Sequence, residues 1–353
     1  MALYKDQHYV PRFYLKNFSN CNTIGIYNLK ARQFFRRSYR ALCSKKYFYS
    51  KDSKFEKAIS PIEGRYSKAI NRLAKAKDLS KLDPNDYCAM LSFVVFQNSR
   101  TSRQKLNSQR MLGYETEVLK EALRLNKPDI SEELINTVEI KSNVHFFRMG
   151  YALTCGPLLI SDLNSKIIIN RSTRDFLISD EPVIFYNARF NDMGYGTTGF
   201  QTPGLQIFCP LNPKTMLIFY DKEYYDFGLG NKINVFLDSD VDSLNLLQLF
   251  NANGNIFFSN DNHKNYIKKL HSKIDFLLDN CSNAIEMTTH SNKEDNSKIF
   301  CLSAPSINYN LDLSFMIVKP IIRKEIPRSR SKELIEIGDD LMAIFKKKHA
   351  NEV

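Results

Sequence analysis

The chain has 353 residues, a net charge of +12 at pH 7 and a hydrophobic fraction of 43%. This length allows one large domain or two ordinary ones, with enough apolar residues for a sizeable core. No run reaches the roughly 18 uncharged apolar residues of a membrane span, and the first residues lack the apolar stretch of a secretory signal. The seven cysteines stand singly, without a Cys-x-x-Cys pair, which is typical of reduced thiols and argues against a cysteine zinc site. We therefore expect a cytoplasmic protein without a membrane partner.

The basic residues are clustered along the chain. Residues 30–51 hold eight basic side chains and no acidic one, with aromatic residues interleaved, and residues 87–114 carry only basic charges. Further lysines and arginines gather between residues 319 and 348. Clustered cations beside aromatic rings suit a polyanion, above all nucleic acid. The other interpretation, a solvated basic surface without such a partner, stays open.

The first predicted element lies in QHYVPRFYLKNFSN, near the start of the chain. Pro11 suits the first turn of a short helix, on which Val10, Tyr14 and Phe18 fall four residues apart on one apolar side. His8 precedes this helix in an extended context and lies outside its apolar stripe. Packing therefore explains the aromatic residues but not His8, which becomes a candidate site residue.

A hairpin and a helical block follow. Residues 24–28 and 32–38 read as two strands joined by a short polar turn. Between residues 54 and 153, apolar residues recur every three or four positions, which predicts a mainly helical block. Inside it, the string from Ser60 to Glu63 matches a capping box, so the first helix is expected to restart or kink there. Asp83-Pro84 opens a second helix, expected to run through Leu112 or beyond.

The rest of the chain begins with a β-rich segment. Short β-branched and aromatic runs separated by turns predict an antiparallel meander from about 157 to 220. Helices are expected at residues 241–251 and 263–281, with the strand NIFFS between them. Residues 284–310 are polar without a clear period, which predicts a surface loop, and a final helix is expected from about 333 to 348.

These elements predict an α+β fold. It is a single unit with an N-terminal β-hairpin, a long helical block and an antiparallel β-meander, followed by C-terminal helices. We expect a core domain of residues 1–283 and a C-terminal extension of residues 284–353 that holds the basic segment and the terminal helix.

The chemical motifs of common enzyme classes are missing. Residues 194–199 match G-x-G-x-x-G, but Pro203 and a further strand follow where a dinucleotide fold needs a helix, which predicts a flexible connection or a lid. The sequence has no P-loop, H-E-x-x-H, G-x-S-x-G or Arg-x-x-x-x-His string. Glu139 and Lys141 precede the predicted strands, so the carboxylate order of a restriction-type nuclease is not met.

Two sets of polar residues each allow two interpretations. Asp180, between two apolar runs, could have a raised pKa or hold a metal, or it could accept backbone N–H groups in a turn, which the pattern favours. Gln97, Arg100 and Gln104 share a face of the predicted second helix. Arg100 either binds phosphate or pairs with Glu63 or Glu56. His145, between Val144 and Phe146, is interpreted as a satisfied core or edge histidine.

The motifs occur in an order that resembles a known family. QHYVPRFYLKNF, SPIEGRY, FQNSRT, FLISDEPV, IFCPLNP and VDSLNLLQLFNANGNIFFSN follow one another between about residues 7 and 260. The chain is similar to a bacterial family known only as a domain of unknown function, number 4238. Glu181 stands where many relatives have a smaller polar residue. The polar hallmarks that the resemblance carries over are His8, Glu63, Gln97, Arg100, Asp180 and Asn245.

Membership would favour one convergent pocket, and hence a nuclease-like hydrolase of nucleic acid or nucleotides. In this hypothesis His8 is the general acid or base, Asp180 and Glu63 bind a divalent cation (Mg or Mn), and Arg100 stabilises phosphate charge. Gln97 and Asn245 would support this site. The nucleic acid would be held by four arginines: Arg36, Arg37, Arg40 and Arg103.

Two alternatives to this hydrolase remain. One is a non-catalytic nucleic-acid-binding module, and the other is a protein-interaction module; in both, the polar hallmarks form a buried structural network. A defence or toxin role in a bacterial cell would suit the enzyme. The sequence names neither the reaction nor a protein partner.

Overall fold

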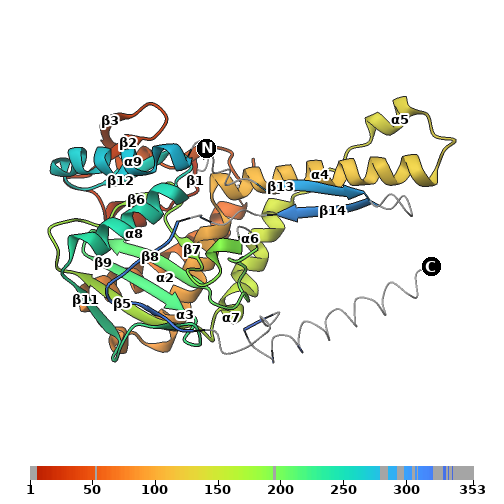
Figure 1. The fold of residues 1–353 in the computed structure, drawn as a ribbon. Coiled ribbons are helices and arrows are strands. Elements are labelled where there is room, and N and C mark those ends of the chain that lie inside the picture. Colours follow the sequence, from red (N-terminus) through yellow and green to blue (C-terminus); the bar gives the residue numbers. More distant parts are fainter. Residues whose placement is uncertain are drawn as a thin grey trace.

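The computed structural model describes residues 6–51, 54–193, 196–278, 285–291, 298–303 and 309–320, together with residues 307, 329, 330, 333 and 336. Helices and mostly antiparallel strands are mixed along this part of the chain, which confirms the α+β class (Figure 1). The predicted terminal helix lies largely outside the described residues. None of the helices in the described ranges is both long and apolar enough to cross a membrane.

The N-terminal segment forms two small antiparallel pairs around a short helix. β2 and β3 pair from Thr23↔Ser38 to Asn28↔Gln33, which confirms the predicted hairpin. β1 pairs with β4, and Val10, Tyr14 and Phe18 are completely buried as predicted, although the helix α1 is shorter than predicted and contains only Tyr14 of the three. The elements are β1 (Asp6–His8), α1 (Arg12–Lys16), β2 (Thr23–Asn28), β3 (Gln33–Ser38), η1 (Tyr39–Ala41) and β4 (Ser44–Lys46).

The predicted helical block is confirmed, with two corrections. The first helix runs unbroken through Pro61, so the capping box is wrong, and Glu63 lies in the middle of a helix. The second predicted helix ends at Ser99, and a new helix starts at Ser102 because Thr101 is extended. The elements are α2 (Lys54–Ala76), η2 (Leu79–Lys81), α3 (Pro84–Ser99), α4 (Ser102–Asn126), α5 (Glu132–Thr137), α6 (Val144–Thr154) and α7 (Gly156–Leu159).

Two sheets carry the β-rich half. The expected antiparallel strands are present, but the chain order is a meander only for β7, β8 and β9, because β5 pairs with the far side of β9 and β6 joins β12. The five-stranded sheet has the order β11-β5-β9-β8-β7, and the four-stranded sheet β3-β2-β12-β6. The new strands are β5 (Asn164–Asn170), β6 (Ile178–Ser179), β7 (Ile184–Tyr186), β8 (Gln206–Asn212), β9 (Thr215–Tyr220), β11 (Lys232–Val235) and β12 (Asn255–Phe258).

The C-terminal elements include the helices predicted at residues 241–251 and 263–281. Residues 284–310 are not the expected loop, since β13 and β14 pair as an antiparallel hairpin in the described part of this segment. A 3-10 turn, η3 (Asn191–Met193), lies after β7, and the short strands β10 and β15 pair with each other. The elements are α8 (Asp238–Asn251), η4 (Asp261–His263), α9 (Lys264–Leu278), β10 (Tyr225–Asp226), β13 (Glu286–Ser291), β14 (Lys298–Ser303) and β15 (Ile317–Val318).

The five-stranded sheet is covered on both faces. Ile167 and Leu217 face a core shared with α2 and α3, whereas Ile168 and Met216 face a second core shared with α8 and α9. Every residue of β9 is therefore buried, which is why TMLIFY shows no alternation of apolar and polar residues. From this body α4 projects outward with α5 at its far end, and the β13–β14 hairpin runs beside it (Figure 1).

Candidate functional site

The break between α3 and α4 places Arg100 inside the protein. Arg100 is the C-cap of α3 and exposes only 1% of its surface. Its guanidinium donates to Glu63 Oε1 (2.6 Å), to the Tyr49 hydroxyl (2.9 Å) and to the backbone oxygen of His8 (2.5 Å). Burial by itself would lower the pKa of Arg100, but Tyr49 and Glu63 raise it. All three nitrogens are engaged, so Arg100 is a structural cation that joins three elements.

His8 is extended, as predicted, at the end of β1. Its Nε2 atom lies 3.1 Å from the backbone oxygen of Arg40 and 3.2 Å from Nε of Arg12. Only one of these is a hydrogen bond at a time, because Nε2 either donates or accepts. Burial and the Arg12 charge lower the pKa of His8 below its usual 6.5. The half-buried ring is therefore neutral near pH 7 and stays at the margin of the Arg100 cluster.

Gln97 holds the chain next to His8. Its side-chain amide donates to the backbone oxygen of Tyr9 at 2.9 Å, and the side chain is fully buried. Gln97 and Arg100 thus bind consecutive carbonyl groups of the N-terminal segment. They do so from the last turn of α3, while Gln104 belongs to a different helix and points elsewhere. The prediction that Gln97, Arg100 and Gln104 share one helical face is therefore wrong, because Gln104 belongs to a second helix.

Asp180 and Glu181 accept hydrogen bonds from backbone and side-chain N–H groups of the protein. Asp180 Oδ1 accepts from the backbone nitrogen of Asn253 (2.8 Å), and Oδ2 accepts from the side-chain amide of Asn255 (3.3 Å). Glu181 Oε1 accepts from the backbone nitrogen of Arg103 (3.1 Å), at the first turn of α4. Burial raises the pKa of both carboxyl groups, that of Glu181 to about 7. The turn-forming interpretation of Asp180 agrees with these contacts.

Three amide side chains on α8 bind the strand that contains β6. Asn245 Oδ1 accepts from the backbone nitrogen of Leu177 (2.8 Å), and Gln248 Oε1 accepts from that of Ser179 (3.0 Å). Asn251 donates to the backbone oxygen of Glu181 at 2.6 Å. Asn245, Gln248 and Asn251 recur every three positions along α8. Their partners are the backbone groups of every second residue along the extended chain, from Leu177 to Glu181. Asn245 therefore has a structural role in holding β6.

Glu63, Gln97 and Arg100 thus take part in a polar network around the α3–α4 junction, which also includes Glu181, Arg103 and Asn251. This network links the N-terminal segment, α2, the β6–β7 turn and α8, whereas the His8 ring and Asn245 make their hydrogen bonds outside it. A divalent cation on Asp180 and Glu63 does not fit this network, since Asp180 already receives N–H groups on both oxygens and Glu63 binds Arg100. Within the described ranges, no three histidine, cysteine or acidic side chains converge as a metal site.

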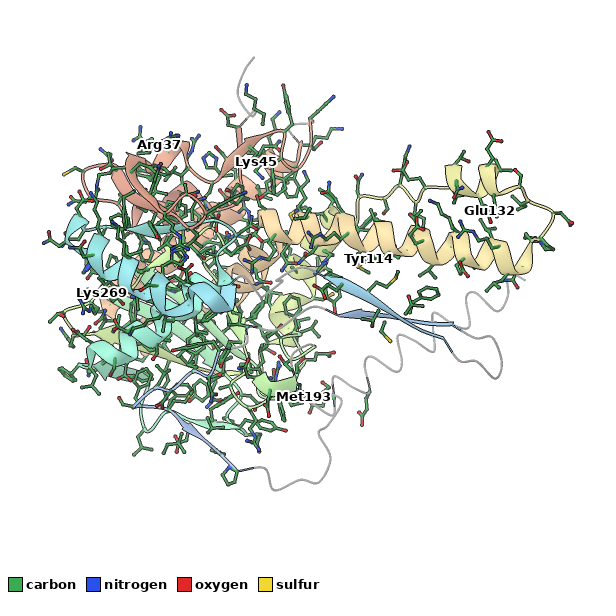
Figure 2. The ribbon with its side chains drawn as sticks, turned by 45° about the horizontal axis from the view of Figure 1, so that its top comes forward. Arg37, Lys45, Tyr114, Glu132, Met193 and Lys269 are labelled. Carbon is green, nitrogen blue, oxygen red and sulfur yellow. The ribbon has the colours of Figure 1, made fainter. Side chains whose placement is uncertain are left out.

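The arginines that were predicted to bind nucleic acid differ in their exposure and in their contacts with the protein. Arg36 donates to the backbone oxygen of Ser259 (2.7 Å) and forms an ion pair with Asp261 (3.2 Å), so it holds β3 against η4. Arg37 and Arg40 are exposed, and each guanidinium lies over a nearby aromatic ring. Arg37 lies on the same side of the molecule as Lys45 (Figure 2). These exposed cations fit the expected basic surface.

Arg103 lies at a cavity of about 720 Å³ that the sequence did not single out. We call it the arginine pocket, after Arg103 on α4 and Arg148 on α6. Arg103 donates to the side-chain and backbone oxygens of Asn251, and Arg148 donates to Gln104 Oε1 at 3.3 Å. Neither arginine has an ion pair in the described part of the chain, and no described lining residue is acidic.

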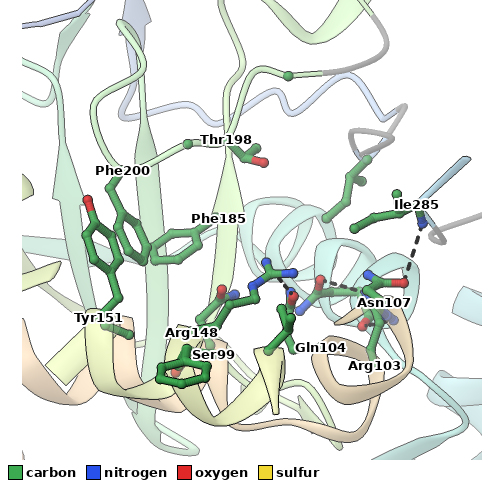
Figure 3. Close-up of a pocket in the computed structure, with 18 residues that line it drawn as sticks. Ser99, Arg103, Gln104, Asn107, Arg148, Tyr151, Phe185, Thr198, Phe200 and Ile285 are labelled. Atoms are coloured by element: carbon green, nitrogen blue, oxygen red, sulfur yellow. Dashed lines mark hydrogen bonds between the residues drawn. The ribbon is translucent and has the colours of Figure 1, made fainter. Parts of the chain in front are cut away.

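Aromatic side chains form the other walls of the arginine pocket. Phe185 and Phe200 pack edge to face with ring centroids 5.7 Å apart. Tyr151 lies beside them, and Arg148 and Gln104 point toward one another in the middle of the site (Figure 3). Phe147, also on α6, exposes 69% of its surface. The pocket therefore combines positive charge, amide groups and flat apolar surfaces.

The family comparison agrees with this architecture. The model of a family described as "Protein of unknown function (DUF4238)" matches residues 6–262. The chain belongs to the DUF4238 family. No match was found among curated proteins or among solved structures. The DUF4238 match includes all six hallmark residues from His8 to Asn245 and the two arginines of the arginine pocket, and it ends before the β13–β14 hairpin.

Sequence reasoning within this DUF4238 chain missed Arg148 and the role of the glycine string. Gly196, Thr198 and Gly199 line the arginine pocket, although residues 194 and 195 lie outside the described ranges. A signal for α6 was present in VHFFRMGY, because Val144, Arg148 and Tyr151 are spaced for one helical face. That spacing alone cannot tell a pocket from a solvated surface.

Proposed function

We propose that this chain binds the phosphate and base of a nucleotide, free or within a single strand of nucleic acid, in the arginine pocket. The observation that carries the proposal is the pair Arg103 and Arg148, which face a cavity without an acidic lining residue or an ion pair in the described structure. Planar guanidinium groups match phosphate with paired N–H donors. An anion at this position would compensate Arg148 above all, because the charge of Arg103 already interacts with the buried carboxyl groups of Asp180 and Glu181.

Arg148 supports this proposal most directly. Its polar partner in the described structure is the amide oxygen of Gln104, and burial lowers its pKa without a carboxylate to oppose the effect. A half-buried cation that lacks a counter-charge is unfavourable in the free protein. A bound phosphate would remove this disadvantage, so the charge is better explained by a ligand than by packing.

The aromatic walls of the arginine pocket would bind the base of the nucleotide. Bases stack on aromatic rings with about 1–3 kcal/mol per base, largely independent of sequence. Phe147 and Tyr151 expose 69% and 52% of their surfaces on the same helix that carries Arg148. Exposed rings beside an uncompensated arginine are the combination that single-stranded nucleic acid and nucleotides need.

The contacts favour binding over hydrolysis. The hydrolase hypothesis needs Arg100 and Asp180 to reach a substrate, yet both side chains are buried and hydrogen-bonded to the protein. The alternative hypothesis of a binding module with a buried polar network requires only the contacts described above. We therefore propose binding without assigning a catalytic residue.

The test is the binding of a short fluorescein-labelled single strand, followed by anisotropy at low salt. We expect Arg148→Gln to raise the Kd about tenfold, since one charge-assisted contact is worth about 1.5–3 kcal/mol and tenfold corresponds to about 1.4 kcal/mol. Lys269→Gln is the matched control, because Lys269 is an exposed cation on α9 (Figure 2). It should change the Kd by less than twofold.

Competition separates the two sources of the ligand. Displacement of the strand by adenosine monophosphate would identify a free nucleotide, and displacement by unlabelled strand alone would identify a nucleic-acid segment. Equal Kd values for the wild type and Arg148→Gln would contradict the proposal. The same samples on a denaturing gel test hydrolysis: we expect intact strands, and cleavage that His8→Ala abolishes would favour the hydrolase instead.

A further inference from the structure

A second cavity, of about 760 Å³, lies behind the helices that form the arginine pocket. On α4, Arg103 and Asn107 face the arginine pocket, whereas Lys105 and Leu112 face the second cavity. On α6, Arg148 faces the first and His145 the second. The two helices therefore form a common wall between two separate sites. We call the second one the histidine pocket.

His145 lines this pocket without a polar partner. Both ring nitrogens are buried, and neither makes a hydrogen bond with any described group, which contradicts the interpretation of a satisfied histidine. The ring lies parallel to Tyr49 with centroids 6.4 Å apart and edge-on to Phe48 at 6.2 Å. Packing fixes the imidazole, but it leaves an N–H donor and a lone pair unused. Buried polar groups of this kind are normally satisfied.

Lys105 adds a positive charge to the same pocket. Its Nζ donates to the backbone oxygen of Phe48, and it forms no ion pair with the described residues. Burial and the nearby charge of Lys45 lower the pKa of Lys105. No described residue lining the pocket is acidic. The polar end of the pocket therefore offers donors and positive charge, and its described lining residues supply no carboxylate.

The remaining walls are largely apolar. Phe55 on α2, Leu112 on α4, and Phe146 and Met149 on α6 line the pocket. Phe55 and Phe146 pack with ring centroids 5.2 Å apart. Cavities of about 300–1,000 Å³ with apolar walls and a few converging polar groups are typical of small-molecule sites. The shape and the charge of the pocket together suit a ligand with one anionic end and one apolar end.

We propose that the histidine pocket binds a small organic anion, whose charged group accepts hydrogen bonds from Lys105 and His145 and whose apolar body packs against Phe55, Phe146 and Leu112. A carboxylate would satisfy the unused imidazole N–H and compensate the lysine at once. A neutral ligand of the same shape would leave Lys105 without a counter-charge. This inference does not depend on nucleotide binding in the arginine pocket.

Calorimetric titration with octanoate, 1-octanol and octylammonium tests the charge requirement, because the three probes share one apolar chain. We expect octanoate to bind at one site at least tenfold more tightly than octanol, and octylammonium to bind more weakly still. Lys105→Met should remove the preference for octanoate over octanol. Arg148→Gln should leave octanoate binding within twofold, so that failure here is distinguishable from failure of the proposed nucleotide site.

Imidazole NMR signals of the wild-type protein provide a readout that does not depend on a variant. The ring signal of His145, assigned by its loss in His145→Gln, should shift on addition of octanoate and stay unchanged with octylammonium. An unmoved His145 signal at saturating octanoate would overturn the proposal. Equal affinity for octanoate and octanol in the wild type would overturn it as well.

Discussion

At the scale of single residues, Arg100 shows how a hallmark can be structural. Its charge is buried, and its three hydrogen-bonded partners come from β1, from the segment after β4 and from α2. Removing one partner of a buried ion pair costs about 3–5 kcal/mol, because the other charge remains without compensation. Glu63 is 26% exposed, so water reduces that cost here.

We expect Arg100→Met to lower the free energy of unfolding by about 3 kcal/mol and Glu63→Gln by about 1 kcal/mol, since glutamine still offers an oxygen to Arg100. Urea unfolding followed by circular dichroism measures both. If Arg100→Met unfolds like the wild type but no longer binds nucleic acid, Arg100 contacts the ligand and the structural role is wrong.

Glu181 makes the stability of the protein depend on pH. Burial raises its pKa from 4.5 to about 7 in the folded state. The folded protein then holds a proton that the unfolded chain has released, so this contribution is present below about pH 4.5 and is lost as pH rises through about 7. A shift of this size corresponds to roughly 3 kcal/mol.

We therefore expect the wild type to lose more stability than Glu181→Gln when the pH is raised from about 5 to about 8, with a difference of roughly 2–3 kcal/mol. Urea unfolding of both proteins at the two pH values gives this difference directly. Glutamine keeps the acceptor for the Arg103 N–H but does not titrate. Parallel curves for the two proteins would show that Glu181 has an ordinary pKa.

At the scale of elements, α8 binds the edge of β6 that does not pair with β12. The chain around β6 is only two residues of regular strand, and the amides of Asn245, Gln248 and Asn251 take the place of a neighbouring strand. Gln248 also donates to the backbone oxygen of Pro182 at 2.8 Å. This explains why a buried helix face carries polar residues at a regular spacing.

Gln248→Met tests this arrangement, because methionine keeps the volume and removes the hydrogen bonds. We expect a loss of about 2–4 kcal/mol in unfolding free energy, since two buried backbone groups lose their partners at about 1–3 kcal/mol each. Gln109→Met on the exposed face of α4 is the matched control and should change stability by less than about 0.5 kcal/mol. Similar values for both variants would contradict the role of α8.

At the scale of the whole molecule, the net charge is +12, but the basic side chains differ in exposure and in their contacts with the protein. Arg36 is held by Ser259 and Asp261, whereas Arg37 and Arg40 point outward on the same basic segment. Only exposed cations can release counter-ions when they meet phosphate. The distribution therefore predicts which arginines would determine the salt dependence of the proposed nucleic-acid binding.

We expect the double variant Arg37→Gln, Arg40→Gln to reduce the slope of log K against log salt for a single strand by about 1.4, or about 0.7 for each phosphate that is no longer neutralised. Arg36→Gln should leave the slope unchanged and lower the unfolding free energy instead. Anisotropy titrations over a range of salt concentrations measure the slopes. If Arg36→Gln alone changes the slope, Arg36 reaches the nucleic acid despite its contacts.

The sequence by itself determined the features that depend on neighbours along the chain. The β2–β3 hairpin, the helical block, α8 and α9 follow from periodicity and turn residues, and the burial of Val10, Tyr14 and Phe18 around α1 follows from their spacing. The polar hallmarks were also found from sequence, but their contacts were not. Whether a buried arginine binds phosphate or Glu63 depends on which elements meet around it.

Only the tertiary structure decided the break at Thr101, the pairing of β5 with β9, and the two pockets on either side of α6. The break becomes favourable because Glu181, far away in sequence, accepts the Arg103 N–H at the start of α4. Arg148 and His145 are three residues apart and only about 60° apart around α6, yet the boundary between the two cavities falls between them. Such choices depend on long-range contacts, and local patterns contain no information about them.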